Sequence, residues 1–147
     1  MEHYILNIET AGEGDIIDIT PDVQKLLSES RLSDGIVNIF CEGSTAAITT
    51  IEYEPGVLED LNRALNVIAP ADAEYKHDLA WGDGNGRSHV RAAIIGPSLT
   101  VPFRDKSLLL GTWQQIVLLE LDVRNKRSRK VHCTLLGDLG SLFRNSV

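Results

Sequence analysis

The sequence predicts an α+β fold in which one curved, mostly antiparallel sheet carries two or three short helices on one side. Segments typical of strands outnumber those typical of helices, and the connections between strands have the length of hairpins. The chain has 147 residues, which is the size of one ordinary domain, and it contains neither an internal repeat nor a linker. We therefore expect a single domain over residues 1–147.

Eight segments alternate apolar and polar residues or are rich in β-branched residues, and both patterns are typical of strands. In chain order, the predicted strands are Tyr4–Glu9, Asp15–Ile19, Gly35–Cys41, Thr45–Glu52, Leu99–Phe103, Ser107–Leu110, Gly111–Asp122 and Lys130–Leu136. The two strands that flank the sequence RDK are expected to form a hairpin.

Three segments have apolar residues at the spacing of an amphipathic helix. The first spans 20–30, where Thr20 is predicted as the N-cap and Pro21 suits the first helical position. The second spans 57–68 and begins with acidic residues, which favour the positive end of a helix. The third, 88–96, is a short helix that follows a glycine-rich loop.

Composition limits the classes of function. The net charge is −7, which disfavours a nucleic-acid partner, and no apolar run approaches the length of a membrane span. The one basic cluster, Arg124–Lys130, is interpreted as a solvated hairpin turn rather than an anion-binding patch. Cys41 and Cys133 lie in apolar strands and are expected as buried, reduced thiols. The start of the chain does not resemble a signal peptide, so we expect a cytoplasmic protein without nucleic-acid or membrane partners.

The segment YKHDLAWGDGNGRSHVRAAIIG carries most of the candidate chemistry. His77 and His89 lie twelve positions apart, a spacing that is not itself a metal motif, but Asp78 and Asp83 beside them could bind a metal or fix a histidine tautomer. We predict a divalent metal site, with Mg²⁺ or Zn²⁺, formed by His77, His89 and Asp83. The alternative is a pair of ordinary surface histidines.

The same segment could bind an anion. A glycine-rich approach to a helix directs free N–H groups at one point, and such a point favours phosphate. Asn85, Gly86, Arg87 and Arg91 are therefore candidate ligands for a phosphorylated small molecule. The alternative is a simple loop with an N-cap, which explains the glycines but not the histidines.

Two further places contain candidate residues. Ser44 and Thr45 could hold phosphate oxygens, although a strand start or a β-bulge explains them equally well. Glu120 follows a run of apolar residues, so a buried carboxylate there would need Arg127 or Arg129 as its partner. That pair could be structural or could belong to the site.

Four motifs in a fixed order resemble the YjbQ family over nearly the whole chain. They are GSTAAITTIEYEPG, YKHD…DGN…SHVRAAIIGPSLTVPF, LLLGTWQQIVLLELD and RSRKVHCTLLG. The resemblance implies a half-barrel-like sheet, assembly as a homotrimer and a low-level thiamine-phosphate synthase activity. That reaction joins a pyrimidine pyrophosphate to a thiazole phosphate and releases pyrophosphate. The family pattern maps onto His77, Asp78, Asp83, Asn85, His89, Trp113, Gln114, Glu120 and Arg129.

One departure concerns the metal. Many family members have a histidine where this chain has Gly43, so the resemblance implies that one ligand is missing unless Glu42 or Glu52 replaces it. The predicted catalytic residues are His77, His89 and Glu120. The predicted ligand-binding residues are Ser44, Thr45, Asn85, Gly86, Arg87, Arg91, Gln114 and Arg129. The first hypothesis is a transferase acting on phosphorylated heterocycles; the others are a non-catalytic metabolite- or metal-binding protein and a purely structural role.

Overall fold

The protein was analysed as a computed structural model, which describes residues 1–140. The predicted domain boundary at 147 therefore lies outside the described residues. In the described part the elements are β1 (Glu2–Thr10), β2 (Ile16–Asp18), α1 (Thr20–Glu29), β3 (Leu32–Cys41), β4 (Ala46–Ile51), α2 (Pro55–Ile68), α3 (Lys76–Trp81), α4 (Gly86–Ile95), β5 (Ser98–Arg104), β6 (Ser107–Leu108), β7 (Gln115–Glu120) and β8 (Arg127–Leu139).

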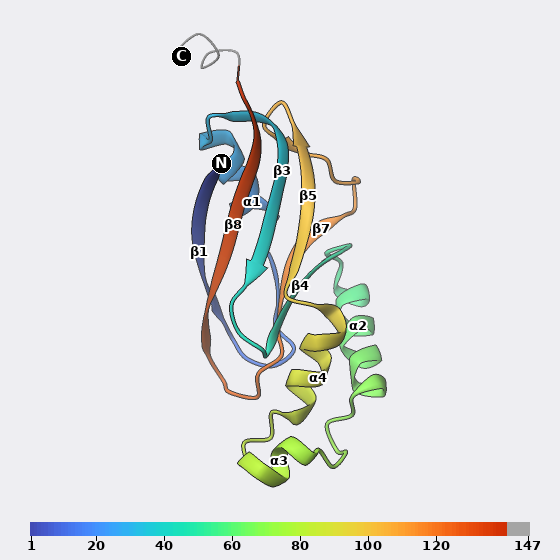
Figure 1. The fold of residues 1–147 in the computed structure, drawn as a ribbon. Coiled ribbons are helices and arrows are strands. Elements are labelled where there is room, and N and C mark those ends of the chain that lie inside the picture. The colour runs from blue at the N-terminus through green and yellow to red at the C-terminus, as the bar shows by residue number, and fades with distance from the viewer. Residues whose placement is uncertain (141–147) are drawn as a thin grey trace.

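The strands pair antiparallel in two sheets. One has the order β1-β8-β3-β5-β6 and the other the order β2-β7-β4. Figure 1 shows β1, β8, β3 and β5 side by side, while α2, α3 and α4 gather at one end of the molecule. The predicted α+β fold with a curved, half-barrel-like antiparallel sheet is confirmed.

The main core lies between the two sheets. Alternate residues of β3 and β8, such as Val37, Ile39, Val131 and Cys133, are buried and meet residues of β7 and α1. Val23 and Leu27 place the apolar face of α1 in this core, as the helical spacing predicts. Strand alternation leaves the opposite face of β1, β8, β3 and β5 outside the core.

A second core covers the other face of the three-stranded sheet. Leu65 of α2 and Ala92 of α4 pack there against Val117 and Leu119 of β7. Strand β7 is therefore buried on both faces, which explains why its sequence, QIVLLE, lacks the alternation of a half-exposed strand. This packing fixes α4, and with it one half of the candidate site, on the sheet.

Some predicted details are wrong. Thr20 is the first residue of α1 rather than its N-cap, and its hydroxyl accepts a hydrogen bond from the Ile116 amide at 2.8 Å. The strand predicted over 111–122 begins only at Gln115, because the preceding residues form a turn. Helix α3 was not predicted, since six residues are too few to show a helical period.

Two other expectations can be compared with the structure. Both cysteines are free and buried, and burial raises the pKa of the Cys41 thiol to about 11 and that of Cys133 to about 12. Among residues 1–140, no helix has the length and apolar character needed to cross a membrane.

Candidate functional site

Helix α3 and the start of α4 carry the polar segment. Helix α3 ends at Trp81, and the residue that caps it, Gly82, has a φ of 67°, in the left-handed region that glycine adopts without steric cost. The turn that follows brings Asp83 back toward His77, and α4 then carries His89. This helix–turn–helix arrangement, and not the twelve-residue spacing, brings the predicted site residues together.

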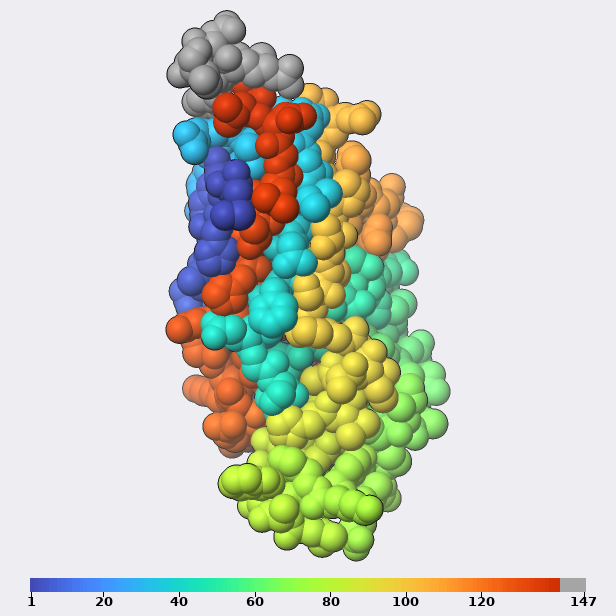
Figure 2. Space-filling view, viewed as in Figure 1, coloured from blue at the N-terminus to red at the C-terminus, as the bar shows by residue number. Residues whose placement is uncertain are grey.

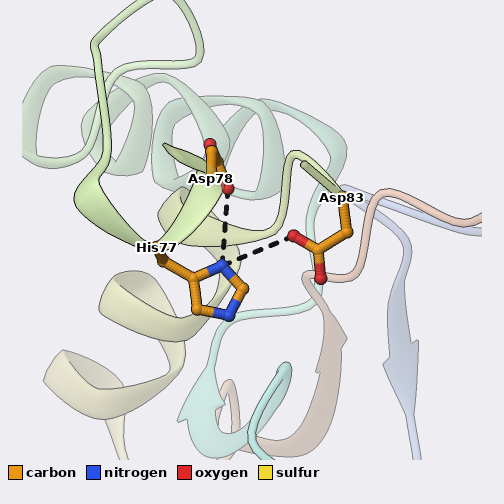
Figure 3. Close-up of side chains that lie close together, drawn as sticks. All are labelled: His77, Asp78 and Asp83. Atoms are coloured by element: carbon orange, nitrogen blue, oxygen red, sulfur yellow. Dashed lines mark hydrogen bonds and ion pairs between the residues drawn. The ribbon is translucent and has the colours of Figure 1, made fainter. Parts of the chain in front are cut away.

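His77 lies between two carboxylates (Figure 3). Its Nδ1 is 3.5 Å from Oδ1 of Asp78 and 3.4 Å from Oδ1 of Asp83. One ligand atom from each of these three residues lies within 4.8 Å of the others. The three side chains are partly exposed, so an ion from solvent can reach them.

His89, which α4 carries, lies beside this group. The centroids of the His77 and His89 rings are 4.6 Å apart, with the ring planes inclined at 51°. Nδ1 of His89 lies 3.2 Å from the carbonyl oxygen of Ser44, and because a carbonyl only accepts, Nδ1 carries the proton. Nε2 of His89 then keeps a lone pair, which is the form that binds metals.

The amides at the start of α4 are already occupied by the chain's own aspartates. Oδ1 of Asp78 accepts a hydrogen bond from the Gly86 amide at 2.8 Å, and Oδ1 of Asp83 accepts one from the Asn85 amide at 3.0 Å. Carboxylates are favoured at this positive end of a helix. A phosphate bound to Gly86 and Asn85, as the sequence predicts, would have to displace them.

The two arginines predicted to bind phosphate are also engaged. Arg87 forms a two-pronged ion pair with Glu13, with N–O distances of 2.7 and 2.8 Å. Arg91 is buried, donates twice to the carbonyl of Ala69 and reaches Glu13 at 3.2 Å. The hydrogen bond from Arg87 lowers the pKa of the Glu13 carboxyl, so this pairing is firm over the neutral range.

Sequence reasoning missed Glu13, which lies 74 positions before Arg87 in a short turn. Nothing in the local sequence AGEGD marks it as a partner. Glu13 pairs with Arg87 and Arg91, so these arginines link the β1–β2 connection to α4 instead of being free to bind an anion.

Glu120 is the acceptor of a buried charge pair. Arg129 donates to both of its oxygens, through Nε at 2.8 Å to Oε2 and through Nη2 to Oε1. Thr10 Oγ1 and the Asp122 amide donate to the same carboxylate at 2.8 and 3.0 Å. Burial alone would raise the pKa of Glu120, but these hydrogen bonds outweigh burial and lower it.

These contacts correct the catalytic role predicted for Glu120. The side chain is fully buried and has no exposed oxygen with which to take a substrate proton. Arg129, predicted to bind a ligand, is equally buried, and its Nη2 also donates to the hydroxyl of Thr45 at 2.9 Å. Of the two partners that the sequence offered Glu120, Arg129 is the one found, and the pair is structural.

Asp122 links the Glu120–Arg129 pair to Asn85 at the start of α4. The hydroxyl of Thr45 donates to it at 3.0 Å, and the side-chain amide of Asn85 lies 3.4 Å away. Burial would raise the Asp122 pKa, but hydrogen bonds from Arg124, Thr45 and Asn85 lower it well below its usual range. Arg127 pairs with Asp122 as well. In the basic turn that the sequence predicts to be solvated, Arg124 and Arg127 are thus paired with the buried carboxylate of Asp122.

Asn85 acts as a buried bridge rather than as an exposed ligand. Its Oδ1 accepts hydrogen bonds from Ser88 at 2.9 Å and from the Val123 amide at 3.0 Å. The side chain therefore ties the N-terminus of α4 to the end of β7. We assign it a positioning function, because it sets where the turn that carries Asp83 ends and α4 begins.

The remaining predicted residues lie elsewhere. Gln114 donates to Thr50 Oγ1 at 3.2 Å, near the end of β4, whereas Thr45 precedes the start of that strand. Glu42 points to His132, and Glu52 lines a separate hollow with Tyr53. Neither glutamate replaces the histidine that the family resemblance leads us to expect at position 43.

A small pocket adjoins His89. It has a volume of about 230 Å³ and a mostly apolar lining. The lining residues are Gly43, Ser44, Ala46, His89, Ala92, Ala93 and Pro97. Of the predicted phosphate ligands, Ser44 alone lines this pocket. The pocket is large enough for a small ring beside His89.

Comparison with known proteins agrees with this fold. The family described as UPF0047 protein YjbQ-like matches residues 4–138. A UPF0047 protein of Methanothermobacter thermautotrophicus is 39% identical over 139 residues, covering 93% of this chain and 94% of the relative. The UPF0047 protein YugU of Bacillus subtilis is 32% identical over 133 residues, covering 90% and 97%.

Solved structures are similar as well. A crystal structure of a protein of unknown function from Sulfolobus solfataricus has a TM-score of 0.80 and 33% identity, covering 93% of this chain and 99% of that one. A hypothetical protein from Aeropyrum pernix has a TM-score of 0.85 and 30% identity, covering 94% and 100%.

Proposed function

The chain belongs to the UPF0047 family of YjbQ-like proteins, and we propose that it binds one divalent metal ion between α3 and α4. The observation that carries this proposal is the cluster of ligand atoms from His77, Asp78 and Asp83 within 4.8 Å, with the His89 ring beside it. The ligands would be His77, Asp83 and His89, with Asp78 adjacent.

The donor set favours zinc over magnesium. Two imidazoles with carboxylates are a usual zinc environment, whereas Mg²⁺ prefers oxygen ligands and retains its water. His77 Nδ1 faces both carboxylates, so a metal ion would take the place of the proton between these groups. With three protein ligands, a tetrahedral ion would keep one coordination position open to water or substrate.

A phosphorylated small molecule is the substrate class that we propose for this site. Arg87, Arg91 and Arg129 are paired with carboxylates, so the metal itself would supply the positive charge that a phosphate or pyrophosphate needs. The apolar pocket beside His89 could accommodate a heterocycle. Transfer of the thiamine-phosphate synthase type fits these two features, and a non-catalytic metal- or metabolite-binding protein is the alternative. The homotrimer stays a proposal that sedimentation velocity can test.

Metal analysis of the purified protein tests the binding site. We expect wild-type protein to retain one equivalent of metal more than His77→Ala or His89→Ala, after dialysis without chelator. Glu74→Gln, an exposed carboxylate change just before α3, is the matched control and should retain the wild-type amount. Equal metal content in wild type and both histidine variants would refute the proposed site.

Turnover decides between the two functional classes. Zinc-loaded protein would be incubated with the pyrimidine pyrophosphate and the thiazole phosphate, and pyrophosphate release measured. An enzyme should lose this release in His89→Ala and keep it in Glu74→Gln. Metal bound as expected, with no release above background, would support the non-catalytic alternative.

A further inference from the structure

All four histidines of the chain occur in two pairs, and the second pair lies on the outer face of the five-stranded sheet, whereas α2 and α4 cover the three-stranded sheet. It consists of His3 in β1 and His132 in β8. Nε2 of His3 is 3.0 Å from Nδ1 of His132, and the ring planes are nearly parallel, at 10°. The first pair belongs to the site described above, whereas the second has no place in that site.

The strand register produces this second pair. Strands β1 and β8 are antiparallel, with His3 opposite Thr134 and Ile5 opposite His132. His3 and His132 are therefore diagonal neighbours on one face, a separation that long side chains can bridge. Val131 and Cys133 point into the core, so strand alternation turns His132 outward.

The third member of the group is Glu42, which follows β3. Its Oε2 lies 2.9 Å from Nε2 of His132. An ionised carboxylate only accepts, so Nε2 of His132 carries the proton. Nδ1 then holds a lone pair that points toward His3. A carboxylate behind an imidazole in this way is the usual support of a metal-binding histidine.

The nitrogen separation suits a shared metal ion. With Zn–N bonds of about 2.0–2.1 Å, two nitrogen ligands of a tetrahedral zinc ion lie about 3.3 Å apart. The observed 3.0 Å requires only a small rotation of exposed side chains. Figure 2 shows the outer surface of β1, β8, β3 and β5 without a covering helix, so solvent and ions reach this face.

We propose that His3 and His132 form a second transition-metal site, held ready by Glu42, which takes Zn²⁺ and leaves its other positions to water or an added ligand. Imidazole nitrogen is the donor type that Zn²⁺ and its neighbours in the first transition series prefer. The bound ion would replace the proton that Nε2 of His3 donates to Nδ1 of His132. This inference does not depend on the function proposed for the first pair.

The test isolates the second pair by removing the first. In a His77→Ala/His89→Ala background, His3 and His132 are the remaining histidines of the chain. Zn²⁺ affinity would be measured by competition with a coloured chelator, and imidazole nitrogen shifts would be followed by NMR. We expect one Zn²⁺ per chain, with shifts at Nε2 of His3 and Nδ1 of His132.

Further variants in that background separate metal binding from a plain hydrogen bond. His3→Ala or His132→Ala should abolish the saturable binding, and Glu42→Gln should weaken it about 10- to 100-fold, as loss of such a supporting carboxylate does elsewhere. Ser128→Ala, an exposed change on β8, is the matched control and should leave the affinity unchanged. No saturable binding in the background protein, or binding that survives His132→Ala, would overturn the proposal and leave the two imidazoles as a hydrogen-bonded pair.

Discussion

Replacing Glu120 with glutamine should strongly destabilise the fold while leaving its shape unchanged. The carboxylate accepts hydrogen bonds from Thr10, from the Asp122 amide and twice from Arg129. Glutamine has nearly the same volume but one acceptor oxygen, and in either orientation its amide nitrogen would face an Arg129 N–H group, which cannot accept a hydrogen bond. Arg129, which is 2% exposed, would also keep its charge without a counter-ion.

The expected loss is about 3–5 kcal/mol, the usual cost of removing one partner from a buried ion pair. For a chain of this length, such a loss lowers the melting temperature by about 10–16 °C. The remaining stability is small because a domain of this kind begins with only about 5–15 kcal/mol. The variant should therefore fold at room temperature and unfold at much lower urea concentration.

Urea unfolding at neutral pH measures this loss, with two comparisons. Asp60→Asn makes the same chemical change in the exposed pair with Arg63 and should cost less than about 1 kcal/mol. The double variant Glu120→Leu/Arg129→Met removes both charges together and should be more stable than Glu120→Gln alone. A Glu120→Gln protein as stable as Asp60→Asn would refute the assignment of a buried structural pair.

The difference in unfolding free energy between wild type and Glu120→Gln should depend on pH, because it arises from the charge of Glu120. The folded-state pKa of Glu120 is lowered, so its contribution is fully present above the unfolded pKa of about 4.3. That contribution is lost as the pH falls through the folded pKa. The stability gap between wild type and Glu120→Gln should thus narrow in acid below pH ~4. A gap of constant size down to strong acid would contradict this mechanism.

Three further outcomes are expected. Gly86→Ala should disturb the turn before α4 and weaken metal binding, since an added Cβ would lie 2.4 Å from Cβ of Tyr75; equal affinity in both proteins would contradict this. Cys41 and Cys133 should resist a thiol reagent at pH 8 in folded protein and react once urea unfolds it, because burial raises both pKa values. Saturating Zn²⁺ should slow amide hydrogen exchange in α3, which has no buried residue to hold it; unchanged exchange would argue against ligands from both helices.

The sequence predicts the strands and the longer helices well, because their patterns are local. Helix α2 was expected over 57–68 and is found over Pro55–Ile68, with the Glu54 carboxylate accepting hydrogen bonds from the Gly56 and Val57 amides at its start. Helix α3 was missed, although a glycine at its C-terminal end was an available signal. Six residues without a buried face leave no hydrophobic period to detect.

The sequence predicts only the part of the candidate site whose residues are close together in the chain. His77, Asp83 and His89 lie within one segment, so local chain reversal can bring them together. The partners of Arg87 and Asn85 lie 74 and 37 positions away, and no local pattern announces them. Arginines were therefore expected to bind phosphate, whereas the fold had already paired them with its own carboxylates.

Asp78 and Asp83 contact both the start of α4 and His77. A helix N-terminus attracts an anion, and here Asp78 and Asp83 occupy it with one oxygen each, facing the Gly86 and Asn85 amides. The same carboxylates lie beside His77 and can share their negative charge with a cation. Oδ1 of each aspartate faces both its backbone amide and Nδ1 of His77, so a bound metal would lie close to the helix end. The backbone amides that predicted a phosphate site thus hold two carboxylates in place beside His77. A phosphate would then bind through the metal ion rather than through these amides.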